Sequence, residues 1–154
     1  MPISESAMQE ACNKARSFFD AGFNCAEAVA TAAGGTLNPE QVFFPKVATI
    51  FGGGCGRRGE TCGALIGALM AISSVYGRQP QEGPEAKKRC YDLAEMVVED
   101  FKERYGTLLC RELTGVDLST REGQKAFEEL RIHQNRCTAL VEDATRLALI
   151  HGAS

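Results

Sequence analysis

Apolar residues recur along this chain with the spacing of amphipathic helices, and no run alternates strictly between apolar and polar as a β-strand would. Glycine and proline mark the ends of the helical stretches. The expected helices cover residues 6–20, 25–33, 38–44, 62–76, 84–105, 108–113, 119–130 and 136–150. The pattern therefore predicts an all-α single domain over residues 1–154, built as a bundle of about six to eight helices.

Some of these boundaries depend on only one or two residues. Gly34 and Gly35 are expected to end the second helix, because glycine is the usual residue after a helix. Asn38-Pro39 is interpreted as a cap followed by a proline at the first position of the third helix. Pro45 is expected to kink or split that third helix.

Composition is typical of a folded domain and argues against two kinds of partner. With 154 residues, 44% of them hydrophobic, the chain can bury about two thirds of its unfolded surface. The net charge of -3 comes from mixed charges, so we expect no binding to nucleic acid. The longest apolar stretch, 64–76, is shorter than the roughly 20 residues of a membrane helix. Segment 1–16 lacks the apolar centre of a signal peptide, which favours a cytoplasmic location.

Cysteine is the residue type with the most chemical potential here. Seven cysteines in a reducing compartment favour redox or metal chemistry over a framework of disulfides. Four of them follow a residue suited to cap a helix, in the pairs Asn24 and Cys25, Thr61 and Cys62, Thr107 and Cys110, and Asn135 and Cys137. A helix start lowers the pKa of a thiol, and so do the neighbouring arginines at 57, 58, 111 and 136. We therefore expect these four thiols to ionise readily, whereas Cys12 and Cys90 fall in the middle of helices and should only pack.

The four capped cysteines fall on the second, fourth, sixth and eighth expected helices. Short connections favour antiparallel neighbours, in which case even-numbered helices all begin at the same end of the bundle. The four thiols would then converge at that end.

The most specific short string is Cys62-Gly63-Ala64-Leu65-Ile66-Gly67, which follows a glycine-rich loop at 52–59. Its two glycines each cost about 1 kcal/mol in helix propensity, which suggests that a bare helix face has a use. That use is either tight helix packing or close approach of the backbone to a site, and both interpretations are open. The same face could also serve a homodimer.

With this string the chain resembles the family of redox-active proteins named C_GCAxxG_C_C, which has a CGAxxG element and four characteristic cysteines in about this length. The resemblance covers nearly the whole chain and matches Phe23-Asn24-Cys25-Ala26, Cys62 to Gly67, Cys110-Arg111-Glu112-Leu113, and Cys137 with Val141-Glu142-Asp143-Ala144. It implies a redox function and names no substrate. Cys55, in the glycine-rich loop, is additional to the four and could be a resolving thiol, a further ligand or a surface residue.

Two functions remain open at this stage. In a thiol/disulfide oxidoreductase, Cys62 is the first candidate nucleophile and Cys25 the second, with Cys110, Cys137 and Cys55 as further redox thiols. In a metal or iron-sulfur module, Cys25, Cys62, Cys110 and Cys137 are thiolate ligands, although their wide spacing lacks the close pairs usual in such sites. The sequence leaves the redox partner and the cofactor unspecified: either none, or a thiolate-bound metal or cluster.

Three weaker interpretations complete the set. A bundle whose cysteines only pack is disfavoured, because inert cysteines would be scattered along the apolar faces. His133 could join a metal site, although a single histidine near a helix end is more often a surface or cap residue. The loop 52–59 could hold an anion at the start of the fourth helix, but it lacks the spacing and the lysine of a phosphate-binding loop.

Overall fold

The structure is a computed structural model that describes residues 2–40 and 45–153. Its α-helices are α1 (Glu5–Asp20), α2 (Cys25–Leu37), α3 (Gly52–Cys55), α4 (Gly63–Tyr76), α5 (Pro84–Tyr105), α6 (Cys110–Thr114), α7 (Arg121–Glu129) and α8 (Thr138–Gly152). A 3₁₀-helix, η1 (Lys46–Phe51), precedes α3, and a π-helix, η2 (His133–Cys137), precedes α8. Apart from one isolated bridge between Thr61 and Leu109, the described residues contain no β-structure. The prediction of an all-α bundle is confirmed.

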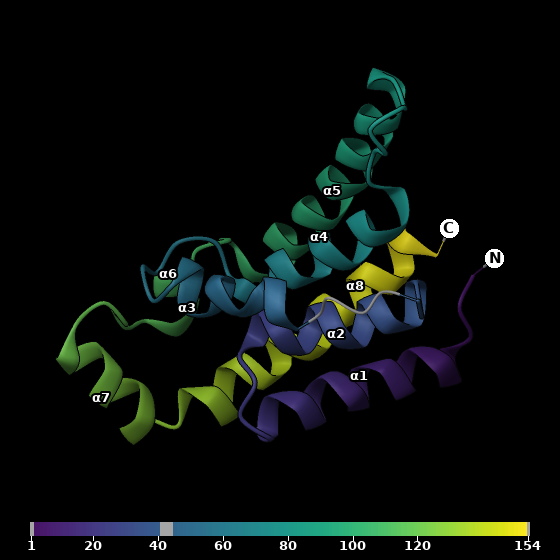
Figure 1. Cartoon of the computed structure of the whole chain (residues 1–154). Helices are drawn as coiled ribbons and strands as arrows, with labels where there is room; N and C mark the ends of the chain where they lie inside the picture. Colours follow the sequence, from purple (N-terminus) through teal and green to yellow (C-terminus); the bar gives the residue numbers. More distant parts are fainter. Residues whose placement is uncertain (1, 41–44, 154) are drawn as a thin grey trace.

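The bundle is centred on α2, which packs against α1, α4 and α8 (Figure 1). The buried side chains of α2 are small, namely Ala26, Ala28, Val29, Ala30, Ala32 and Ala33. Small side chains allow close helix approach, and a Cβ on Gly67 of α4 would lie 2.7 Å from the backbone oxygen of Ala26. Gly67 therefore serves tight packing between α2 and α4. Its face points into the bundle, and the oligomeric state stays a prediction.

Two helices extend from this bundle in different directions (Figure 1). The C-terminal half of α5 is anchored by the buried side chains of Val97 and Phe101, whereas its N-terminal half is mostly exposed and points away from the other helices. The short helix α7 lies at the opposite edge. Within the described ranges, no helix has both the length and the apolar character needed to cross a membrane.

The predicted boundaries after α2 are wrong. This helix runs through both glycines of its predicted end to Leu37, because burial of its alanine-rich face outweighs the low helix propensity of glycine. Asn38 ends α2 instead of opening another helix, and its side-chain nitrogen donates to the backbone oxygen of Ser74 at 2.9 Å. Residues 41–44 of the predicted third helix lie outside the described residues. Pro45 is the residue before η1, so it starts a new element there.

Candidate functional site

Four cysteines from separate segments line one cavity of about 570 Å³. Cys25 begins α2, Cys62 directly precedes α4, Cys110 begins α6 and Cys137 ends η2. All seven cysteines of the chain lie within the described residues and are free thiols. The predicted convergence of the four thiols is confirmed, while their chemical roles remain a prediction.

The start of α2 is held by a set of hydrogen bonds around Cys25. The Asn24 side chain accepts from the backbone N–H of Glu27 at 2.8 Å, and the Glu27 carboxylate accepts from the N–H of Asn24 at 2.8 Å. The Asn24 side-chain nitrogen donates to the backbone oxygen of Thr49, whose hydroxyl donates to Glu27 at 2.7 Å. The predicted cap is thus confirmed, and it also fastens α2 to η1. Cys25 is therefore fixed in place from two sides.

Cys62 and Cys110 are held together by backbone pairing between their segments. The N–H of Cys62 donates to the backbone oxygen of Leu108 at 2.7 Å, and the N–H of Cys110 donates to the oxygen of Glu60 at 2.7 Å. A Cβ on Gly54 would lie 2.7 Å from the Cβ of Cys110, so the glycine-rich loop also packs closely against this pair of segments. The local backbone therefore fixes the entry to α4 and the entry to α6 relative to each other.

Three of the four predicted caps are wrong. Cys62 itself is the N-cap of α4, so Thr61 lies outside the helix. The N-cap of α6 is Leu109, and Thr107 contributes only by accepting from the backbone N–H of that residue at 3.2 Å. Asn135 lies inside η2, so Cys137 lies within a continuous helical segment and not at its start.

The glycine-rich loop contains an unusual left-handed turn. Five consecutive residues, Gly53 to Arg57, have φ values of 65°, 69°, 66°, 68° and 69°. Left-handed backbone costs L-residues about 1–2 kcal/mol each, so the non-glycine residues Cys55 and Arg57 are strained there. Arg57 lines the cavity, whereas Cys55 is absent from the lining formed by the described residues. Cys55 therefore does not line the cavity, and its role stays a prediction.

Burial determines the acidity of the cavity thiols. Desolvation raises the pKa of Cys62 to about 12 and that of Cys110 to about 11. Desolvation likewise raises the pKa of Cys25 and of Cys137. A negative charge on a neighbouring thiol adds to the rise in the pKa of Cys62, Cys110 and Cys137. Arg136 lowers the pKa of Cys137, but burial raises it by more. The prediction of readily ionised thiols is wrong, because it took account of helix starts but not of burial.

His133 also lines the cavity, which the sequence did not favour. Its ring stacks on the ring of Phe19 with centroids 3.7 Å apart and an angle of 6° between the planes. His133 Nε2 lies 3.2 Å from the backbone oxygen of Phe19, so Nε2 must carry the hydrogen that this acceptor requires. The other ring nitrogen, Nδ1, is buried and has no hydrogen-bond partner among the described residues. The His133 ring therefore lies in the wall of the thiol cavity with one ring nitrogen unpartnered among the described residues.

The described residues show no preformed group of ligands for a metal ion. Within residues 2–40 and 45–153, no group of three or more histidine, cysteine, aspartate or glutamate side chains is placed to hold one. The four thiols line a common cavity. The alternative in which these cysteines are metal ligands gains no support from this geometry.

A family model with the description "Putative redox-active protein (C_GCAxxG_C_C)" matches residues 23–149. Because the match covers most of the sequence, the chain belongs to this family. The matched range includes all four cysteines of the cavity. Comparison with curated proteins and with solved structures gives no match.

Proposed function

We propose that this member of the C_GCAxxG_C_C family is a thiol-based redox protein that interconverts thiols and disulfides at the four-cysteine cavity. The main support is that four free cysteines from separate segments line one cavity. A negative charge on Cys25 raises the pKa of each of the other three, as expected of neighbours in a poorly solvated space. Cysteines grouped in this way have the partners that disulfide formation needs.

The reaction that we propose is a two-electron thiol oxidation. Two cavity thiols lose two protons and two electrons and form one S–S bond, while a disulfide of another molecule gains them and becomes two thiols. Cys25, Cys62, Cys110 and Cys137 provide two such pairs. Cys55 is left out of the set because it does not share their cavity.

The raised pKa values have a consequence for the rate and the potential. A thiolate is the attacking species, and burial keeps the cavity thiols protonated near neutral pH. We therefore propose slow reaction with small oxidants and a reduced form that lacks the thiolate stabilisation of strongly oxidising proteins. A cytoplasmic location and a protein thiol or disulfide as redox partner agree with seven free cysteines.

The test is intact mass and thiol counting on protein purified without reductant or chelator, both native and denatured. Oxidation should remove about two mass units per disulfide, reversibly, and peptide mapping should locate the bonds at the cavity cysteines. A Cys12→Ser/Cys90→Ser variant is the matched control and should show the same loss. Bound zinc, copper or iron that protects about four thiols until denaturation would contradict the proposal and favour a metal module.

A further inference from the structure

Backbone N–H groups from three segments lie at the Cys25 thiol, where their hydrogen bonding opposes the rise in its pKa that burial causes. They belong to Cys25 and Ala26 in the first turn of α2, to Ala64 in the first turn of α4, and to Gly53 in the left-handed turn. Each of these N–H groups favours negative charge on this sulfur. For Cys62 the corresponding donors, Ala64 and Leu65, come from α4 alone. Cys25 is thus the cavity thiol with the most varied set of amide donors.

Gly63 explains how the start of α4 comes so close to Cys25. A Cβ on this glycine would lie 2.6 Å from the Cys25 sulfur and 2.6 Å from the backbone oxygen of Phe51. Any larger residue at 63 would push the sulfur away from the N–H groups of α4. The first glycine of the CGAxxG string therefore serves approach to the site, whereas Gly67 serves helix packing.

Access distinguishes Cys25 and Cys137 from the other two cavity thiols. Cys62 and Cys110 are only 5% and 8% exposed, whereas Cys25 is partly exposed. Cys137 is partly exposed as well, but all three other thiols disfavour negative charge on it. A disulfide that enters the cavity would therefore meet Cys25 where backbone amides offset part of the cost of its burial.

We propose that Cys25 is the attacking thiol, that the N–H groups of Gly53, Ala26 and Ala64 form its amide pocket, and that Cys62 is the resolving thiol. This assignment depends on the thiol redox function proposed above and replaces the sequence-based choice of Cys62 as nucleophile. The Cys25 sulfur attacks one sulfur of the incoming disulfide, forms a mixed disulfide and releases a thiolate, which takes up the proton that Cys25 has lost. Cys62 then attacks the Cys25 sulfur, forms the Cys25–Cys62 bond and releases a second thiol with the proton from Cys62.

A trapping experiment with oxidised glutathione as the probe tests the order of attack. In Cys62→Ser the resolving step is missing, so the glutathione mixed disulfide should accumulate on Cys25, as shown by intact mass and peptide mapping. In Cys25→Ser the rate of adduct formation in the cavity should fall at least roughly tenfold, while Cys12→Ser should react like the wild type. Attachment to Cys62 in Cys25→Ser at the wild-type rate would overturn the assignment but leave the redox function intact. If no cavity cysteine of the wild type reacts, both proposals fail.

A matched pair of glycine variants tests the amide pocket. Gly63→Ala and Gly152→Ala each add a Cβ within 2.7 Å of another atom, but only Gly63 abuts the Cys25 sulfur, whereas Gly152 faces the side chain of Leu37 at the end of α2. We expect both variants to lower the melting temperature, and only Gly63→Ala to slow mixed-disulfide formation on Cys25, by roughly tenfold or more per folded molecule. Equal slowing of mixed-disulfide formation in both variants would contradict the proposed amide pocket.

Discussion

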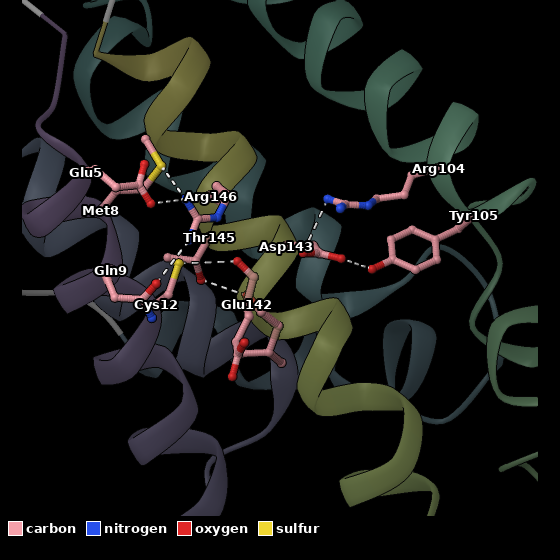
Figure 2. A network of polar contacts seen from close by, with 11 residues as sticks. Glu5, Met8, Gln9, Cys12, Arg104, Tyr105, Glu142, Asp143, Thr145 and Arg146 are labelled. Atoms are coloured by element: carbon pink, nitrogen blue, oxygen red, sulfur yellow. Dashed lines mark hydrogen bonds and ion pairs between the residues drawn. The ribbon is translucent and has the colours of Figure 1, made fainter.

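Cys12 and Cys62 are both buried, at 2% and 5% exposure, but their surroundings differ in kind. Cys12 on α1 faces α8, where its sulfur donates to the backbone oxygen of Glu142 at 3.5 Å among ion-paired side chains (Figure 2). Cys62 lies in a cavity with three other thiols. Burial raises the pKa of both thiols, so neither burial nor acidity distinguishes Cys62 from Cys12. Cys62 differs from Cys12 because other thiols line the same cavity.

The charged groups around Cys12 and Cys62 also differ. Arg146 lies beside Cys12 and pairs with Glu5 at 2.9 Å, and its positive charge opposes the rise in the pKa of Cys12 (Figure 2). In the cavity, the neighbours of Cys62 are thiols whose negative charge would add to the rise. A single buried thiol in a charged network is therefore expected to be inert. Grouped thiols, by contrast, can be oxidised in pairs to a disulfide, with loss of both protons.

The largest expected effect is the alkaline instability of the reduced protein. The folded pKa of Cys62, about 12, lies above the unfolded value of about 9, so the folded state binds more protons between these pH values. The stabilisation is complete below pH 9 and is lost as pH rises, by about 4 kcal/mol at pH 12 for this thiol. Cys62→Ser should flatten the fall in unfolding free energy, measured by urea denaturation under anaerobic reducing conditions. If Cys12→Ser flattened it equally, the grouping of thiols would have no special role.

The pH dependence of the reduction potential is the next expected effect. Because the cavity thiols remain protonated up to pH 9, oxidation of each pair releases two protons with two electrons. The midpoint potential, measured in glutathione redox buffers, should fall by about 59 mV per pH unit between pH 6 and 9. A slope near half of this value would show that one thiol is already ionised and would contradict the acidity assigned to the cavity.

A smaller effect is expected from Tyr105→Phe, on the opposite side of α8 from Cys12. The Tyr105 hydroxyl donates to Asp143, which also pairs with Arg104 at 3.3 Å (Figure 2). Phenylalanine keeps the ring, and Arg104 still pairs with the carboxylate, so we expect a loss of about 1–2 kcal/mol of unfolding free energy. The number of thiols lost on oxidation should not change. A change in the number of oxidised thiols would indicate that the contacts of Tyr105 and Arg104 with Asp143 affect the cavity.

The helical fold and the grouping of thiols could be predicted because both depend on local patterns. Apolar spacing predicts the helices, and cysteines near the expected starts of alternate helices predict that the thiols share one end of the bundle, although only the Asn24 cap is correct. Asn24 was predicted as a cap because its role is local, and the structure confirms it. Asn135 looked equally suitable, but the chain already turns into a helical segment at Ile132, so this cap was predicted wrongly.

The acidity of the thiols and the pocket around Cys25 could not be predicted, because they depend on segments distant in sequence. A helix start is visible in the sequence, whereas desolvation by segments that come together only on folding is not. The N–H groups of Gly53 and Ala64 approach Cys25 only after folding. The one local signal of the pocket is Gly63 after Cys62. From the sequence this glycine could serve either helix packing or close approach to a site, and only the folded structure shows that a Cβ there would meet the Cys25 sulfur.

The smallest expected effect is that of Glu5→Gln in the Cys12 region. Glu5 is 76% exposed, and exposed ion pairs such as that with Arg146 contribute about 0.2–1 kcal/mol, an amount that salt reduces further. Urea denaturation at low and high salt should show this small loss, and the oxidation rate of the cavity thiols should not change. Helix α1 carries Cys12 and also Phe19 of the cavity wall. A slower oxidation in Glu5→Gln would therefore mean that α1 transmits the change, and the two regions would no longer be independent.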